Sequence, residues 1–296
     1  MKTIISLLTF VAMLSMSYAQ ESDSTKQWKT GTSGNITFSQ ISLTNWAPGG
    51  EDSYSFNSIF DFFANYQKGK HSWENNLTMG YGFVKIIGDE TQKATDQIDL
   101  ESKYGKSISD HWSYSAMLNF KTQFAPGYQY PEEGDRVRIS DFLAPGYIIT
   151  ALGMNYKTGD HFSLFLSPAT GKTTLVMDDD LSDAGAFGVE PGDKMLSEYG
   201  GFVKMNYDTD ILKNVNFKTK IDLFSAYNNN PENIDLDWEV MINMKINKFL
   251  STNILTRMVY DHDTKIEKDD GTMAPMLQFK EVFGVGISYT FPEPEE

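Results

Sequence analysis

The sequence contains no cysteine, so neither a disulfide framework nor thiol chemistry contributes to its fold or activity. Basic residues are also scarce, since 25 Lys and Arg stand against 40 Asp and Glu, for a formal net charge of −15. Such an acidic chain binds nucleic acid poorly, and no nucleic-acid partner is expected. No long apolar run follows residue 19 and the mean hydropathy is −0.38, which excludes a helical membrane protein.

The first nineteen residues have the pattern of a secretory signal peptide. Lys2 precedes an apolar stretch from Ile4 to Leu14, and the small residues Ser17 and Ala19 fit a signal-peptidase site. The apolar stretch is too short to span a bilayer as a helix. We therefore expect export, with cleavage after Ala19. Removal of this segment takes away only Lys2, which leaves 24 basic against 40 acidic residues, a net charge of −16.

Strict alternation of apolar and polar residues is the strongest signal in the remaining chain. Every second residue from Ile234 to Ile246 is apolar, and polar or charged residues mostly lie between them. A helix would spread those charges around its whole surface, so the pattern predicts a β-strand. About twelve strands are predicted in this way, near 33–44, 53–67, 71–87, 95–106, 111–124, 143–157, 161–168, 195–208, 213–227, 234–247, 249–260 and 277–291.

Three of these predicted strands are irregular. The alternation fails midway through 33–44 and 143–157, and 161–168 is short. An extra residue in one strand shifts the pattern in this way, so β-bulges are predicted there. Most other predicted strands exceed the roughly 9–11 residues that cross a bilayer at a tilt.

The connections between these strands alternate between long and short along the whole chain. Long links are predicted near 45–52, 88–94, 125–142, 169–194, 228–233 and 261–276, with links of one to five residues between them. Outer-membrane barrels have short periplasmic turns and longer extracellular loops, whereas a soluble sandwich has no reason for such alternation. We predict an all-β fold, an antiparallel up-and-down transmembrane β-barrel of about 12 strands. Residues 20–32 would form a short periplasmic segment, 33–291 the barrel, and 292–296 an acidic periplasmic tail.

Aromatic residues support the same topology. The end of the chain resembles the C-terminal β-signal that the bacterial barrel-assembly machinery recognises, with Gly286, Tyr289 and Phe291 at matching positions. Gly284, where a polar residue is usual, and the acidic tail are departures from that signal. Other aromatics lie beside the predicted short turns, as in an interfacial girdle, although aromatics also simply favour strands. They are Tyr66, Trp73, Tyr104, Trp112, Tyr156, Phe162 and Tyr207.

The sequence predicts no catalytic residues, no metal site and no cofactor. The segment from Gly171 to Thr173 resembles the end of a phosphate-binding loop, but Leu166 stands where that motif requires glycine. His71, His111 and His161 each open a strand after a short turn, where polar rim residues are the simpler explanation than a metal site. Acidic residues in the links 169–194 and 261–276 fit solvated loops, which could bind divalent cations as bridges to surface polyanions.

If the apolar faces meet lipid, the opposite faces point into the barrel. Charges of both signs then fall on neighbouring strands, which fits either a narrow polar pore or a closed, salt-bridged plug. The predicted lumen-facing charged residues are Asp99, Glu101, Lys103, Lys121, Lys204, Lys218, Lys220, Asp222, Asp235, Asp237, Glu239, Lys245 and Arg257.

The stretch LTNWAPGGEDSY, residues 43–54, is predicted to be the first extracellular hairpin. A strand rather than a helix follows it, which argues against a phosphate loop, and a glycine pair supplies the backbone angles of a turn. With this stretch, the chain resembles a family of exported Bacteroidetes β-barrel proteins of unknown function. Asn45, Trp46, Gly49 and Gly50 carry the resemblance. It implies an outer-membrane location and brings no known activity.

The leading hypothesis is therefore a non-enzymatic barrel in the outer membrane of a Gram-negative bacterium. It would pass small polar solutes through a narrow pore or serve as a structural or accessory component. Its expected partners are outer-membrane lipid and, during insertion, the barrel-assembly machinery. One alternative is a membrane-embedded hydrolase, for which only His262 lies at the extracellular end. The other is a soluble secreted lipid-binding β-barrel with its apolar faces turned inward.

Overall fold

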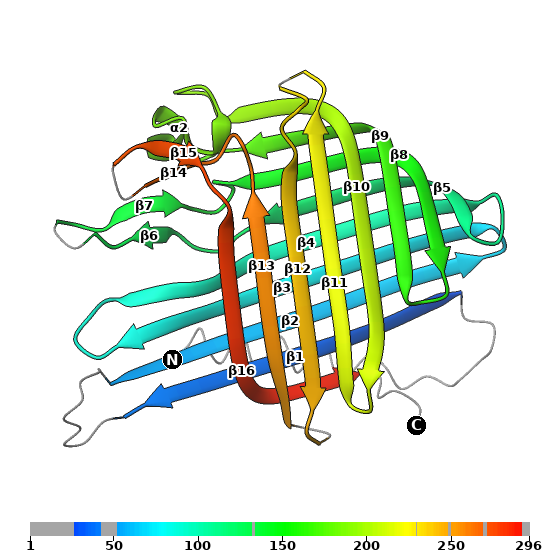
Figure 1. The fold of residues 1–296 in the computed structure, drawn as a ribbon, viewed down its shortest axis with the longest axis horizontal. Coiled ribbons are helices and arrows are strands. Elements are labelled where there is room, and N and C mark those ends of the chain that lie inside the picture. The colour runs from blue at the N-terminus through cyan, green and yellow to red at the C-terminus, as the bar shows by residue number, and fades with distance from the viewer. Residues whose placement is uncertain are drawn as a thin grey trace.

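The computed structural model describes residues 27–42, 52–131, 134–228, 230–247, 250–268 and 271–291. Twelve strands form one closed barrel in which every neighbouring pair is antiparallel (Figure 1). The strands are β1 (Trp28–Ile41), β2 (Ser53–Lys68), β3 (His71–Ile86), β4 (Thr91–Ser107), β5 (Trp112–Thr122), β8 (Gly146–Thr158), β9 (Phe162–Leu175), β10 (Met195–Leu212), β11 (Val215–Ala226), β12 (Asp235–Lys245), β13 (Leu250–Tyr260) and β16 (Gln278–Phe291).

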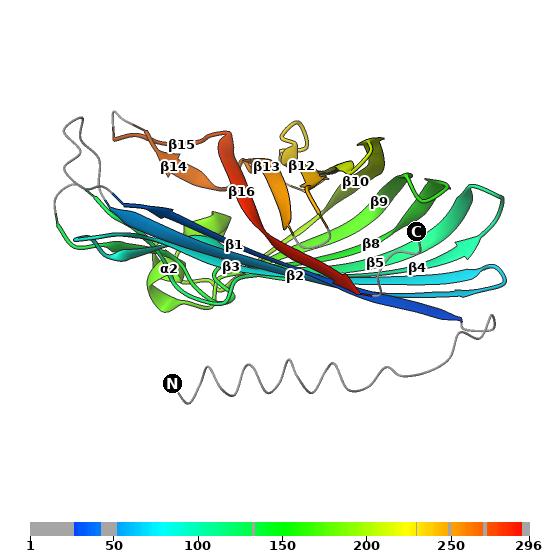
Figure 2. The same ribbon diagram turned by 90° about the horizontal axis from the view of Figure 1, so that it is seen from below.

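The barrel follows the order of the chain. Each strand pairs with the barrel strand before it and the one after it, and β16 closes the ring by pairing with β1, as in Gly34 with Tyr289. Figure 2 shows β1 to β4 as one broad wall, with β12, β13 and β16 on the opposite side. The predicted up-and-down barrel of about twelve strands is confirmed.

The barrel has an apolar exterior and a polar interior. On the outer face, Ile36 is 54% exposed, Leu152 62% and Phe283 67%, whereas Lys204 and Asn119 on the inner face are each 2% exposed. Successive residues of a strand point to opposite faces, so the alternation in the sequence becomes an inside and an outside. A lipid-binding barrel with an apolar interior would have the opposite arrangement, and that alternative is wrong.

β4 and β10 each extend four residues beyond their predicted bounds, to Thr91 and Leu212, and two strands show larger extensions with identifiable reasons. β1 begins at Trp28 rather than 33, because its small and polar residues lack alternation yet pair with β2, as in Gly31 with Phe63. The barrel therefore begins inside the segment predicted to precede it. β9 extends to Leu175 rather than 168, because β-bulges near Pro168 shift its pairing with both β8 and β10. The inward positions change there from odd to even, which hides the second half of the strand from a period-two pattern.

The long links contain structure that the sequence did not predict. The link after β5 forms a hairpin of β6 (Gly127–Gln129) and β7 (Val137–Ser140), and that after β13 forms β14 (Lys265–Glu267) and β15 (Met273–Pro275). The link after β9 contains the helix α2 (Asp179–Asp183) and the 3-10 turn η1 (Ala186–Gly188). All of these lie at the end of the barrel away from the short turns (Figure 1). No helix among the described residues is long and apolar enough to cross a bilayer.

The link 176–194 packs as a small cap with its own apolar core. Ala144, Val176, Leu181 and Val189 are all at most 7% exposed and contact one another. Asp178 begins α2 by accepting a hydrogen bond from the Leu181 amide at 3.0 Å. Its other oxygen pairs with Arg138 of β7, which ties the cap to the neighbouring hairpin.

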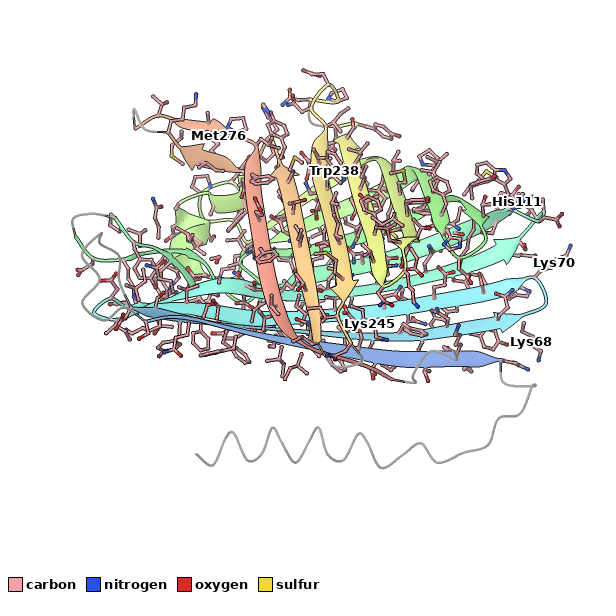
Figure 3. All side chains as sticks on the ribbon, turned by 60° about the horizontal axis from the view of Figure 1, so that its bottom comes forward. Lys68, Lys70, His111, Trp238, Lys245 and Met276 are labelled. Carbon is pink, nitrogen blue, oxygen red and sulfur yellow. The ribbon has the colours of Figure 1, made fainter. Side chains whose placement is uncertain are left out.

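Aromatic rings form a series of contacts at the short-turn end. Trp28 lies with its ring centroid 5.2 Å from that of Tyr66 and 5.9 Å from that of Trp73, and Trp112 lies 5.1 Å from Tyr156. Trp28 joins the predicted girdle because β1 begins earlier than expected. Figure 3 shows Lys68, Lys70 and His111 at this same end, and Met276 at the other.

Some sequence predictions fall outside the described residues. The signal peptide, the tail 292–296 and the hairpin residues Asn45, Trp46, Gly49 and Gly50 all do so. Gly286 lies in β16 and is buried, and the backbone of β16 continues through Tyr289 to Phe291.

The bulge of β9 opposite β8 gives a first prediction. A Cβ atom at Gly153 would overlap the carbonyl oxygen of Leu166 on β9. Gly153→Ala should therefore lower the free energy of unfolding by about 1–3 kcal/mol, the usual cost of overpacking. Gly34→Ala is the matched control, because no atom lies within 4 Å of the added Cβ. Urea unfolding in detergent micelles measures both, and equal midpoints for the two variants would contradict the close approach.

The cap gives a second prediction. The hydrogen bond from Leu181 and the guanidinium of Arg138 hold the pKa of the Asp178 carboxyl below its usual value, against an opposing effect of burial. The stabilisation is therefore present above the unfolded pKa of about 3.9 and is lost as the pH falls through the folded pKa. Hydrogen exchange at Leu181, corrected for the intrinsic rate, should accelerate in acid. Asp178→Asn keeps the acceptor but cannot titrate, so its corrected rate should lack this acid dependence.

Candidate functional site

The barrel interior is crossed by ion pairs between strands that are not neighbours. Lys121 on β5 places its Nζ 3.2 Å from Asp237 on β12, 3.4 Å from Asp222 on β11 and 4.0 Å from Asp99 on β4. The first two strands lie across the barrel from β5 in the strand order. These contacts must therefore run through the lumen and not along the wall.

Further pairs extend this arrangement. Lys204 on β10 lies 2.5 Å from Glu101 on β4 and 3.5 Å from Asp222, and its side chain is 3% exposed. Lys220 lies 3.4 Å from Asp99, and Arg257 donates two hydrogen bonds of 2.8 Å to Asp237. We call this set the ion-pair belt, composed of Asp99, Glu101, Lys121, Lys204, Lys220, Asp222, Asp237 and Arg257.

The other predicted lumen residues lie beside the belt or towards the barrel ends. Lys103 pairs with Glu74 at 3.1 Å on the neighbouring β3. Lys218 pairs with Asp208 at 2.8 Å near the β10–β11 turn, where both side chains are about half exposed. Lys245 is exposed at the short-turn end of β12 (Figure 3). Asp235 belongs to the cluster described next, and Glu239 lines the interior cavity.

A second interior cluster surrounds Lys172, which sequence reasoning missed. Its Nζ lies 2.6 Å from Asp235, 3.4 Å from Glu198 and 3.4 Å from Asp261, and 5.2 Å from the ring centroid of Phe224. Lys172 follows the bulge in β9, after which the inward residues stand at even rather than odd positions. Because the alternation is broken there, the sequence predicted a loop for this segment. The change of phase after Pro168 is the only signal in the sequence that could have found it.

The lumen is packed on one side and open on the other. An apolar cluster with members on β5, β8, β9, β10 and β11 includes Phe165, Phe202 and Phe224, each at most 5% exposed. On β1 to β3 most inward residues are short and polar, although Ile59 and Phe63 of β2 also point inward. Asp61 there is exposed and accepts hydrogen bonds from Thr78 at 2.7 Å and Ser33 at 3.3 Å. The belt thus stands against one wall, and water reaches the interior beside the opposite wall.

An interior cavity of about 520 Å³ lies between the belt and the capping links. Phe187 of the cap and Thr264 after β13 line it at one end, and belt residues such as Lys121 and Arg257 line it at the other. Its walls also include Tyr147 and Phe224. The cavity is therefore both charged and aromatic.

The histidines are not gathered into a site. His71 hydrogen bonds to the Tyr104 hydroxyl, whereas His111 and His161 bond to the carbonyls of Lys157 and Asp208. Each is tied to its own neighbouring hairpin. His262, at the capped end, donates its amide to Asp235 at 3.4 Å, and its Nδ1 has no hydrogen-bond partner among the described residues. Across that same part of the chain, no group of three His, Asp or Glu side chains could hold a metal ion.

The belt gives a third prediction. Lys204→Met would leave Glu101 and Asp222 buried without this ammonium, and loss of one partner from a buried ion pair costs about 3–5 kcal/mol. Lys218→Met removes a half-exposed pair and should cost at most about 1 kcal/mol. Chemical unfolding in micelles, followed by tryptophan fluorescence, compares the two. Equal losses would show that the belt contributes no more than a surface pair.

Comparisons with known proteins give one family match over part of the chain and several solved structures of low similarity. A family described as "Protein of unknown function (DUF3078)" matches residues 38–128. No curated protein matches the sequence. An outer membrane channel from Pseudomonas putida F1 is similar in structure over 91% of this chain and 99% of its own, with 11% identity and a TM-score of 0.38. The NanC porin matches over 88% of this chain and 98% of its own, with 9% identity and a TM-score of 0.40. Identities and scores this low do not transfer a function, so the fold rests on the strand order observed in this chain.

Proposed function

We propose that the protein is a non-enzymatic outer-membrane β-barrel that provides a narrow path for small polar solutes. Its barrel strands have from 11 to 18 residues, long enough to cross a bilayer at a tilt. The exposed apolar residues cover the outer face of the strands, an arrangement that water would disfavour and lipid would favour. The series of aromatic contacts at the short-turn end fits a membrane interface.

The observation that supports a path is the exposure of the belt itself. The side chains of Lys220 and Arg257 point into the barrel, yet 31% and 34% of their surface stays accessible. A closed plug would bury both side chains to the extent that Lys204 is buried within the belt. Asp61 on the opposite wall is exposed as well. The open space thus runs between the belt and β1 to β3, and a solute there meets charges and short polar groups.

The remaining features of the proposal follow from the proposed location in the outer membrane. The signal peptide would be cleaved after Ala19 in a Gram-negative cell, and the assembly machinery would engage β16. The acidic capping links would face outward, where divalent cations could bridge them to surface polyanions. An enzyme is the weaker candidate, because the His262 ring has no hydrogen-bonded nucleophile or acid at Nδ1 among the described residues.

Planar-bilayer recording tests the path and gives a fourth prediction. The purified full-length protein should produce small, stepwise conductances. Asp61→Trp places a large side chain in the open part of the lumen and should lower the unit conductance several-fold. Phe60→Trp, one residue earlier on the outer face, is the matched control and should leave the conductance unchanged. A silent wild-type protein would favour the plug or accessory role, and an unaffected Asp61→Trp variant would place the path elsewhere.

A further inference from the structure

We infer that the interior cavity selects cations and that its ligands are small organic ammonium ions. This inference rests on the proposed channel function and names the class of solute that the channel takes. The cavity lies between the belt and the cap. Its volume of about 520 Å³ falls in the range of small-molecule sites, roughly 300–1,000 Å³.

The charge of the cavity wall is unbalanced. Seven carboxylates line it against four cationic side chains, those of Lys121, Lys172, Lys220 and Arg257. Lys93 pairs with Asp96 at 2.9 Å from outside the lining, so the wall keeps an excess of two carboxylates (seven against five cations). In a low-dielectric enclosure such an excess attracts cations and repels anions more strongly than at an open surface.

Two carboxylates of the cavity lack a close cation or a hydrogen-bond donor. Glu239 lines the cavity and has no cation within 4 Å in the described part of the chain, although Lys220 and Arg257 flank it on the adjacent strands. Asp222 is 7% exposed, and its Oδ1 accepts no hydrogen bond, since Lys204 Nζ stays 3.5 Å away. A buried carboxylate oxygen without a donor favours a ligand that brings one.

The Lys172 cluster shows that this wall can hold an ammonium group. Three carboxylates surround its Nζ, and Phe224 presents its ring 5.2 Å away. Glu198 among them is 3% exposed, and its Oε2 accepts no hydrogen bond. Carboxylates joined to an aromatic face are the combination that proteins use for alkylammonium ions. A solute ammonium entering the cavity meets Asp235, Asp261 and Phe224 of this cluster, with Tyr147 and Phe187 on the remaining wall.

Reversal potentials in a potassium chloride gradient test the selectivity. The wild-type channel should pass potassium about tenfold better than chloride, in line with carboxylate-lined pores. Glu239→Gln should move the reversal potential towards zero. Glu281→Gln is the matched control, because Glu281 pairs with Thr256 beside the same level of the barrel but shares the outer face of β16 with the exposed Phe279 and Phe283. Its reversal potential should equal that of the wild type.

Block by a matched pair of solutes tests the ligand class. Butylammonium should reduce the potassium current in a dose-dependent way, and butyrate of similar size should not. Glu239→Gln should weaken the block at least several-fold, with normal heat-modifiable gel mobility as evidence that the variant is folded. Conductance without cation preference, or equal block by both solutes, would overturn this inference and leave the channel intact. A silent wild-type protein would overturn the channel and this inference together.

Discussion

The structure depends on one constraint, namely that ammonium groups inside the barrel have carboxylate partners supplied by distant strands. Lys204 is almost fully buried, and its partner Glu101 comes from β4 across the lumen, whereas its partner Asp222 lies opposite it on the neighbouring β11. A charge removed from water is costly unless a counter-charge lies close by. Only a closed barrel of this width brings these strands within reach, so closure of the ring and formation of the belt require each other.

The bulges of β9 change which of its residues point into the barrel. At Pro168 the register of β9 shifts against β8 and β10, and the inward phase changes with it. Lys172 turns inward as a result, towards Asp235 and Asp261 on the other side of the lumen. Without the extra residue the lysine would face outward, where a buried charge has no partner and lipid would surround it. One local irregularity thus decides where a principal interior cation lies.

The cap lies at one end of the barrel, and the belt fills one side of its lumen. The link 176–194 has its own apolar core and is tied to β7 by the pair of Asp178 with Arg138, so it is a packed element at this end of the barrel, and its Phe187 lines the cavity. Below it, the aromatic and ionic side chains fill one half of the interior, and small polar groups leave the other half accessible. The narrow, charged path that we propose depends on this asymmetry, since selectivity requires close contact while conduction requires space.

The sequence by itself determined the strands, their number, their antiparallel order and which face of each points inward, because alternation and link length are local properties of the chain. It also named all eight members of the belt, from Asp99 to Arg257, as residues that face the lumen. Only the tertiary structure decided which charges meet, because Lys121 and Asp237 are paired by the curvature of the closed sheet and not by their spacing in the chain. The same holds for Lys172, for the cap and for the open side of the lumen, since each depends on a bulge or on packing between segments far apart in the sequence.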